Sequence, residues 1–99
     1  MKVLLVCAAG MSTSLLTNNM KKNVDPDDVV DAVPVGELES VIDKYDVILL
    51  GPQIRFKEKD VKKLAEPKGI PSGVIDMRAY GMMDGKAAMD QARKLVAGK

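Results

Sequence analysis

The sequence predicts an α/β fold of three layers, in which a four-stranded parallel sheet with strand order 2-1-3-4 carries helices on both faces. Two nearly unbroken apolar runs, at 2–6 and 46–50, are typical of strands that are covered on both sides. Helical patterns alternate with the strands, which favours a parallel sheet with right-handed crossovers. The 99 residues are 46% apolar and 29% charged, without a repeat or a linker, so we expect residues 1–99 to form a single domain.

The first half of the chain supplies two strands and two helices. After the strand Lys2–Val6 we expect a helix from Ser12 to about Asn23, followed by a turn at Pro26, which restricts the residue before it. A weaker strand is predicted over Val29–Val33. A second helix, over about Glu37–Lys44, follows from apolar residues spaced i, i+3, i+4 and i+7. The apolar side of the first helix groups Leu15, Leu16, Asn19 and Met20.

The second half repeats the alternation. The strand 46–50 is ended by Gly51-Pro52-Gln53, and a charged helix is predicted over Lys57–Ala65, whose KEKDVKK run we interpret as a solvated face rather than a docking patch. A short strand over Gly73–Asp76 precedes a last helix, for which Asp84 is the expected N-cap. The inner stripe of that helix is Ala88, Gln91, Ala92, Leu95 and Val96.

Composition excludes several classes of function. The formal charge is +1, so no strong field favours nucleic acid or an anionic membrane. The absence of histidine removes imidazole bases and makes a zinc site improbable, and we expect neither a metal nor a cofactor. One cysteine cannot form an internal disulfide, in agreement with a cytoplasmic location. The apolar run after Met1-Lys2 is interpreted as a buried strand rather than a signal peptide, and no run approaches the roughly 20 residues of a membrane span.

The most informative segment joins the first strand to the first helix. It consists of Cys7, Ala8, Ala9, Gly10, Met11, Ser12, Thr13 and Ser14. Small residues let the backbone curl around an anion, and the amides that open a helix bind a phosphate without a cationic side chain. The same amides would stabilise a thiolate, which is the nucleophilic form of cysteine. The alternatives are that Cys7 is a small buried hydrophobe and that one of the hydroxyl residues is only an N-cap.

A phosphatase is one enzyme class that uses such a loop. Low-molecular-weight tyrosine phosphatases place a cysteine after their first strand, followed after five residues by an arginine that clamps the phosphate. Here that position holds Thr13, and the only Asp-Pro pair, Asp25-Pro26, is expected at the opposite end of the sheet. Without the guanidinium and a nearby acid, a phosphocysteine should hydrolyse slowly. That property suits a carrier of phosphoryl groups better than a phosphatase.

The chain resembles enzyme IIB of the bacterial phosphoenolpyruvate-dependent sugar phosphotransferase system, in its lactose, cellobiose and chitobiose group, over nearly its whole length. The resemblance is carried by the motif Cys7–Ser14, by Val47–Gln53, by Tyr80-Gly81 and by Met83-Asp84-Gly85. Family members often have serine at the position of Ala8, so one hydroxyl is absent here. The resemblance also implies a fold like that of the low-molecular-weight phosphatases.

The resemblance implies a function. Enzyme IIA, carrying phosphohistidine, would pass its phosphoryl group to Cys7, and a sugar bound by the membrane subunit IIC would then accept it, with cellobiose-type β-glucosides as the expected class. A non-catalytic regulatory domain of the same fold is the remaining alternative.

Several residues outside the loop have two interpretations each. Gln53 would either hydrogen-bond the phosphate or serve as a turn residue after Pro52, and Arg55 is more typical of a solvated side chain than of a phosphate ligand. Met82 and Met83 would either join Met11 in an adaptable apolar rim for partners or pack in the core. Asp76 and Asp84 are interpreted as turn and cap residues rather than acids.

Overall fold

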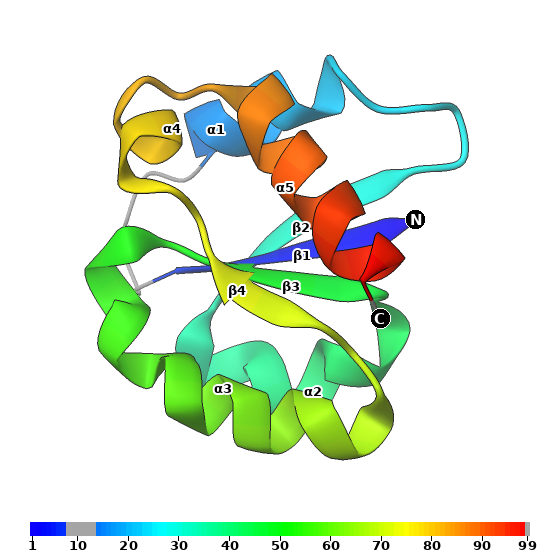
Figure 1. The fold of residues 1–99 in the computed structure, drawn as a ribbon, viewed down its shortest axis with the longest axis vertical. Helices are drawn as coiled ribbons and strands as arrows, with labels where there is room; N and C mark the ends of the chain where they lie inside the picture. Colours follow the sequence, from blue (N-terminus) through cyan, green and yellow to red (C-terminus); the bar gives the residue numbers. More distant parts are fainter. Residues whose placement is uncertain (8–13, 99) are drawn as a thin grey trace.

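The computed structural model describes residues 1–7 and 14–98, and it shows a four-stranded sheet between two helical layers (Figure 1). All strands are parallel, and their order β2-β1-β3-β4 confirms the predicted topology. The strands are β1 (Lys2–Cys7), β2 (Val29–Pro34), β3 (Val47–Leu50) and β4 (Ser72–Val74). β1 therefore lies between two neighbours, and β2 and β4 form the edges.

The helices divide between the two faces of the sheet. One face carries α1 (Ser14–Lys21), α4 (Met77–Gly81) and α5 (Gly85–Ala97), and the other carries α2 (Leu38–Val41) and α3 (Glu58–Ala65) (Figure 1). Four 3₁₀ turns extend this second layer: η1 (Val35–Glu37), η2 (Ile42–Lys44), η3 (Pro52–Lys57) and η4 (Glu66–Lys68).

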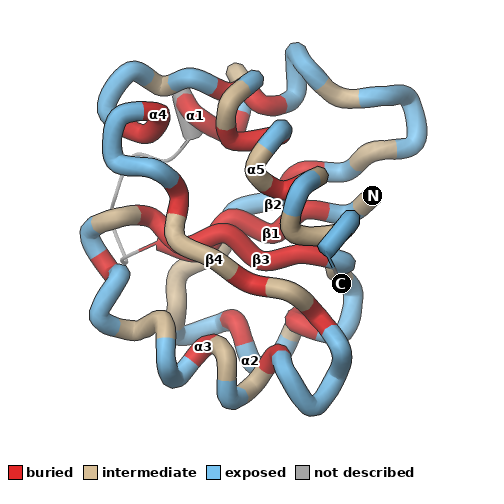
Figure 2. The backbone as a smooth tube through the Cα atoms, in the orientation of Figure 1, coloured by how far each residue is buried: buried red, intermediate tan, exposed pale blue. Residues whose placement is uncertain are grey.

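The sheet separates two apolar cores, and its central strands β1 and β3 are the most deeply buried part of the chain (Figure 2). In β1, Val3 and Leu5 face the layer of α1 and α5, whereas Leu4 and Val6 face the layer of α2 and α3. All four side chains are completely buried. This alternation explains the uninterrupted apolar run, because neither face of the central strand meets water.

Three predicted elements differ from the structure by more than one residue. The segment predicted as one helix over 37–44 is α-helical only at Leu38–Val41, because Val41 leaves the helical region at φ −121° and 3₁₀ turns flank it. Leu38 and Ile42 are nevertheless buried as the periodicity predicted. The last strand ends at Val74 instead of Asp76, and α1 ends at Lys21 instead of Asn23.

Helix α4 was not predicted at all. Its N-cap is Asp76, whose Oδ2 accepts a hydrogen bond from the backbone N–H of Ala79 at 3.1 Å. Asp84 caps α5 in the same way, through the N–H of Ala87 at 3.0 Å. Both aspartates are thus confirmed as caps.

The start of α5 packs directly against the backbone of α1. A Cβ atom on Gly85 would lie 2.2 Å from the carbonyl carbon of Asn19 and 2.4 Å from the amide nitrogen of Met20. The side chain of Asn19 also donates to the carbonyl oxygen of Met83 at 2.8 Å. The helix that follows the Cys7 loop is therefore fixed to α5 by a close backbone approach that only glycine permits.

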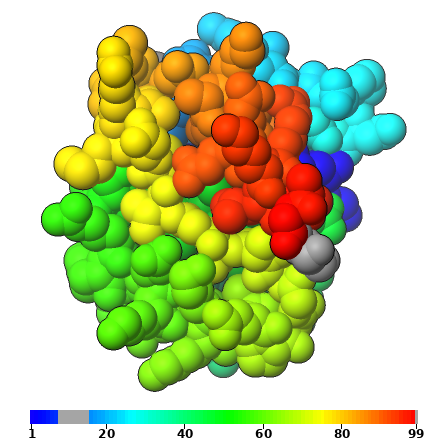
Figure 3. Space-filling model, viewed as in Figure 1, coloured from blue at the N-terminus to red at the C-terminus, as the bar shows by residue number. Residues whose placement is uncertain are grey.

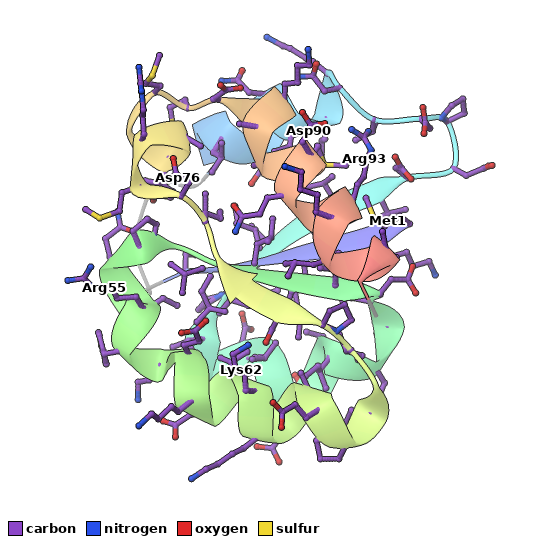
Figure 4. The ribbon with its side chains drawn as sticks, in the orientation of Figure 1. Met1, Arg55, Lys62, Asp76, Asp90 and Arg93 are labelled. Atoms are coloured by element: carbon purple, nitrogen blue, oxygen red, sulfur yellow. The ribbon has the colours of Figure 1, made fainter. Side chains whose placement is uncertain are left out.

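A carboxylate organises the opposite, amino edge of the sheet. The side chain of Asp28 accepts hydrogen bonds from the backbone N–H of Asp25 and from the ammonium group of Met1, each at 3.0 Å, and Arg93 lies 3.9 Å away. Met1 and Arg93 approach this edge from β1 and α5 (Figure 4). The hydrogen bond from Asp25, then the Met1 ammonium and more weakly Arg93, lower the pKa of Asp28 below its ordinary value.

We expect Asp28→Asn to lower the free energy of unfolding at pH 7 by about 1–2 kcal/mol, because it removes charge-assisted hydrogen bonds. Since the folded pKa lies below the unfolded one, this stabilisation is complete above the unfolded pKa, near 3.8, and disappears as pH falls through the folded value. Urea unfolding of both proteins between pH 7 and 2.5 measures the difference. The exposed neighbour Asp27, changed to Asn, is the control. A difference between Asp28→Asn and wild type that persists unchanged into acid would contradict this assignment.

Candidate functional site

Cys7 is the last residue of β1 and lies at the carboxyl edge of the sheet. It is paired with Pro34 of β2, and the preceding Val6 is paired with both Val33 of β2 and Leu50 of β3. Its thiol donates to the carbonyl oxygen of Val33, with sulfur and oxygen 3.6 Å apart, and its side chain is 7% exposed. A ligand in an open α/β sheet binds beyond such strand ends, near the point where strand order reverses. Here the order reverses between β1 and β3.

Most of the predicted phosphate loop lies outside the described residues. This holds for Ala8, Ala9, Gly10, Met11, Ser12 and Thr13. Ser14 is the first residue of α1. The cradle of backbone amides therefore stays a prediction from the sequence.

Two other segments meet Cys7 at the same edge (Figure 1), because the carboxyl ends of parallel strands lie together. The N–H of Gly51 donates to the carbonyl oxygen of Val6 at 2.9 Å, and the N–H of Ile75 donates to that of Leu50 at 2.8 Å. The first bond ties the start of η3 to the strand that carries Cys7, and the second ties the end of β4 to β3. Gln53 is exposed in the η3 turn, and its role toward a phosphate stays a prediction.

Tyr80 is a residue of this edge that the chemical interpretation of the sequence missed. It belongs to α4, is 9% exposed, and has its ring carbon Cε2 3.7 Å from where a Cβ of Gly51 would lie. This is an ordinary contact distance, so the ring packs against the turn whose N–H is bonded to the carbonyl oxygen of Val6. The only signal in the sequence was the pair Tyr80-Gly81, noticed for its resemblance rather than for a chemical role.

Exposed apolar side chains surround the edge. Among the described residues with large apolar side chains, Phe56 is 73% exposed, Met82 68% and Met77 64%. Phe56 belongs to η3, Met77 begins α4 and Met82 follows α4. These segments lie on either side of the carboxyl edge in Figure 1 and at the margin of the surface in Figure 3. We call these three residues the edge patch.

Cationic side chains lie on the same segments as the edge patch. Lys57 has its ammonium nitrogen 5.9 Å from the centre of the Phe56 ring, and Arg78 is exposed on α4. Arg55 points away from the sheet into solvent (Figure 4), as expected for a solvated side chain.

The two methionines after α4 have different environments. Met83 packs partly buried against the core beneath α1 and α5, with φ 53°, whereas Met82 is exposed. The core interpretation therefore holds for Met83, and Met82 is available to a partner. Met11 lies outside the described residues.

Two further features concern metals and membranes. Within residues 1–7 and 14–98, no group of three or more acidic or cysteine side chains is arranged to hold a metal ion. In the same described part of the chain, no helix is both long and apolar enough to cross a membrane.

Sequence comparison relates the chain to one family. Residues 2–91 match the family model described as the lactose/cellobiose-specific IIB subunit of the PTS system. The chain is 41% identical to the oligo-beta-mannoside-specific EIIB component of Bacillus subtilis, over 96% of this chain and 95% of that protein. It is 39% identical to the galactose-specific EIIB component of Lactococcus lactis subsp. cremoris and, equally, to the cellobiose-specific EIIB component of L. lactis subsp. lactis, over 95% of this chain and 94% of each.

Comparison of structures agrees. The solution structure of the cellobiose-specific phosphotransferase IIB component from Borrelia burgdorferi superposes with a TM-score of 0.79 at 38% identity, covering 100% of this chain and 94% of the other. The lactose-specific IIB component domain from Streptococcus pneumoniae gives a TM-score of 0.82 at 22% identity, covering 96% of each chain, a likeness of fold.

Proposed function

The chain belongs to the lactose/cellobiose-specific IIB family of the sugar phosphotransferase system (PTS), and we propose that Cys7 is the residue on which it carries the phosphoryl group. Membership makes the protein a sugar-specific phosphotransferase component. The observation that supports Cys7 is its position at the carboxyl end of the central strand, between η3 and α4. Cys7 is also the only cysteine, and the chain contains no histidine.

The proposed reaction has two transfers. In the first, the Cys7 thiolate attacks the phosphorus of a phosphohistidine on IIA, so that a P–S bond forms, the P–N bond breaks and the imidazole leaves with a proton from its surroundings. In the second, the oxygen of a sugar hydroxyl bound by IIC attacks the same phosphorus, so that an O–P bond forms, the P–S bond breaks and the Cys7 thiolate leaves, while the hydroxyl proton passes to a base or water in its surroundings. Since this chain has no histidine, the donor imidazole belongs to the partner. Phosphoryl transfer depends mainly on positioning and fixed dipoles, the expected role of the amides of the loop 8–14.

The other parts of the proposal concern place and substrate. We place the protein in the cytoplasm, where IIA and the inner face of IIC would both reach the Cys7 edge. We propose a β-linked sugar of the cellobiose class. The names of the B. burgdorferi and one L. lactis relative support this class, and the β-mannoside and galactose names of other relatives identify the sugars to test beside it.

The edge patch is the proposed contact surface for IIA. Large apolar side chains that remain exposed beside a reactive residue are typical of a docking site, and methionine adapts to more than one partner. The cations Arg55, Lys57 and Arg78 suit the negative charge of a phosphorylated donor.

We expect Phe56→Ser to raise the KM for phosphorylated IIA about tenfold with little change in kcat, because a centrally placed aromatic side chain can contribute about 1–2 kcal/mol to an interface. Stability should be unaffected, since the ring is 73% exposed. The matched control is Val29→Ser, which removes an exposed apolar side chain (39%) at the amino edge of the sheet. Rapid-quench kinetics at several IIA concentrations give both constants. An equal effect of the two substitutions would argue against this contact surface.

The experiment that tests the function itself is phosphorylation by the upstream proteins. The chain is incubated with phosphoenolpyruvate, the general PTS proteins and a cognate IIA, and intact mass and peptide mapping follow. One phosphate on the Cys7 peptide, kept until sugar-loaded IIC is added, supports the proposal. If the chain carries no phosphate although IIA is phosphorylated, the alternative of a non-catalytic regulatory domain is favoured. Phosphate that is lost rapidly to water would favour a phosphatase.

A further inference from the structure

A glutamine of α5 supplies hydrogen bonds to the outer side of the edge strand β4, at the point where the strand ends. The side-chain Nε2 of Gln91 donates to the carbonyl oxygen of Val74 at 2.7 Å, and its Oε1 accepts from the N–H of Asp76 at 3.2 Å. Val74 offers only an acceptor here and Asp76 only a donor, so the orientation of the amide is determined. Between them, the N–H of Ile75 bonds inward to Leu50 of β3.

This pattern is that of a parallel β-ladder. In such a ladder one residue of a neighbouring strand donates to the carbonyl before its partner residue and accepts from the N–H after it. The Gln91 amide makes both bonds around Ile75, on the side of β4 that faces away from β3. It therefore acts as a single residue of a fifth strand, on an edge that lies between α5 and α3 (Figure 3).

The bonded point is where the chain leaves the sheet for α4. Asp76 is both the acceptor that caps α4 and the N–H donor to Gln91. α4 has only five residues, too few to be stable alone, so its position depends on the burial of Ala79 and Tyr80 and on the bonds at its ends. A shallow cavity of about 380 Å³ beside it, lined by Asp76, Ala79, Ala87, Asp90, Gln91 and Lys94, leaves room for α4 to shift if the bonds are lost.

We propose that Gln91 is a positioning residue for phosphoryl transfer: by holding the connection from β4 to α4, it sets where Met77 and Tyr80 stand at the Cys7 edge. This inference rests on the proposed function. It extends that function to a residue of α5 whose effect on the Cys7 edge is transmitted by the β4–α4 connection. Met77 begins α4 and is part of the edge patch, so its contact with IIA depends on the angle at which α4 leaves the sheet.

The test compares Gln91→Met, which keeps the length of the side chain and removes both hydrogen bonds, with Asp28→Asn, which destabilises the distant amino edge. Both are assayed well below their melting temperatures for transfer from phosphorylated IIA to Cys7. We expect Gln91→Met to raise the KM for IIA about tenfold, the effect of two lost hydrogen bonds, with kcat within about twofold of wild type. We expect Asp28→Asn to leave both constants near wild type.

A double-mutant cycle with Met77→Ser separates positioning from general destabilisation. If Gln91 acts through α4, then Met77→Ser raises the KM clearly in the wild-type background and much less in the Gln91→Met background. Additive effects, or a KM for Gln91→Met equal to that of Asp28→Asn, would overturn the inference. If Gln91→Met does not fold, Gln91→Glu replaces it, since it keeps the acceptor for Asp76 and loses the donor to Val74. Wild type that takes no phosphate on Cys7 would instead refute the proposed function.

Discussion

Gly85→Ala is expected to lower the free energy of unfolding by about 3 kcal/mol, at the upper end of what overpacking costs. The added methyl would lie 2.2–2.4 Å from backbone atoms of Asn19 and Met20, which no rotamer change can relieve. Alanine is the better helix former, by up to about 1 kcal/mol, but the clash is larger and decides the sign. Relief requires α1 and α5 to separate, which would also move the start of the helix that follows the Cys7 loop.

Thermal unfolding measures the effect, and a loss of about 3 kcal/mol corresponds to roughly 12–24 °C in a domain of this size. Gly81→Ala is the matched control, because a Cβ at this position would have nothing within 4 Å and the residue ends the neighbouring helix α4. We expect it to change stability by less than about 0.5 kcal/mol. Equal melting temperatures for the two variants would mean that α1 and α5 do not approach as closely as described.

Cys7→Ser should reduce the rate of transfer from phosphorylated IIA by at least about a thousandfold, a modest figure beside the roughly 10⁶ that loss of a nucleophile can cost. A serine hydroxyl stays protonated at neutral pH, and the chain has no histidine to act as its base. The fold should change little, since a hydroxyl can still donate to the carbonyl oxygen of Val33.

Peptide mapping after incubation with phosphorylated IIA tests this expectation, with Cys7→Ala as a second variant that offers no acceptor at all. The donor should stay phosphorylated beside either variant and transfer normally to wild type added afterwards. Phosphate found on another residue of Cys7→Ala would show that the carrier site lies elsewhere.

The sheet could be predicted because its two central strands are recognisable from the residues of the strands themselves. The runs 3–6 and 47–50, which lie in β1 and β3, are apolar at every position, as expected for a strand between two cores, and alternation with helices then limits the topology. Segment 37–44 shows the limit of periodicity. Leu38 and Ile42 reach the core through α-helical and 3₁₀ turns alike, so the spacing does not distinguish them.

The parts of the edge that were missed depend on contacts between distant segments. α4 is a single turn without an apolar stripe, and it forms where the Asp76 cap, Gln91 and the residues before α5 hold it. Tyr80 and Phe56 have opposite exposures, and nothing in their local sequence distinguishes the buried ring from the exposed one. Cys7 could be singled out because the segment after it is typical of an anion-binding loop, whereas a lone cysteine at the end of a buried strand is often only a small hydrophobe.

The central place of β1 has a consequence for motion. Its amides are bonded between β2 and β3, and its side chains fill both cores, so we expect their hydrogen exchange to require cooperative unfolding of the whole domain. α4, with five residues held largely by side chains, should instead open on its own and exchange early. The sulfur atom would then stay on a stationary support while the surrounding surface fluctuates and adapts to one partner after another.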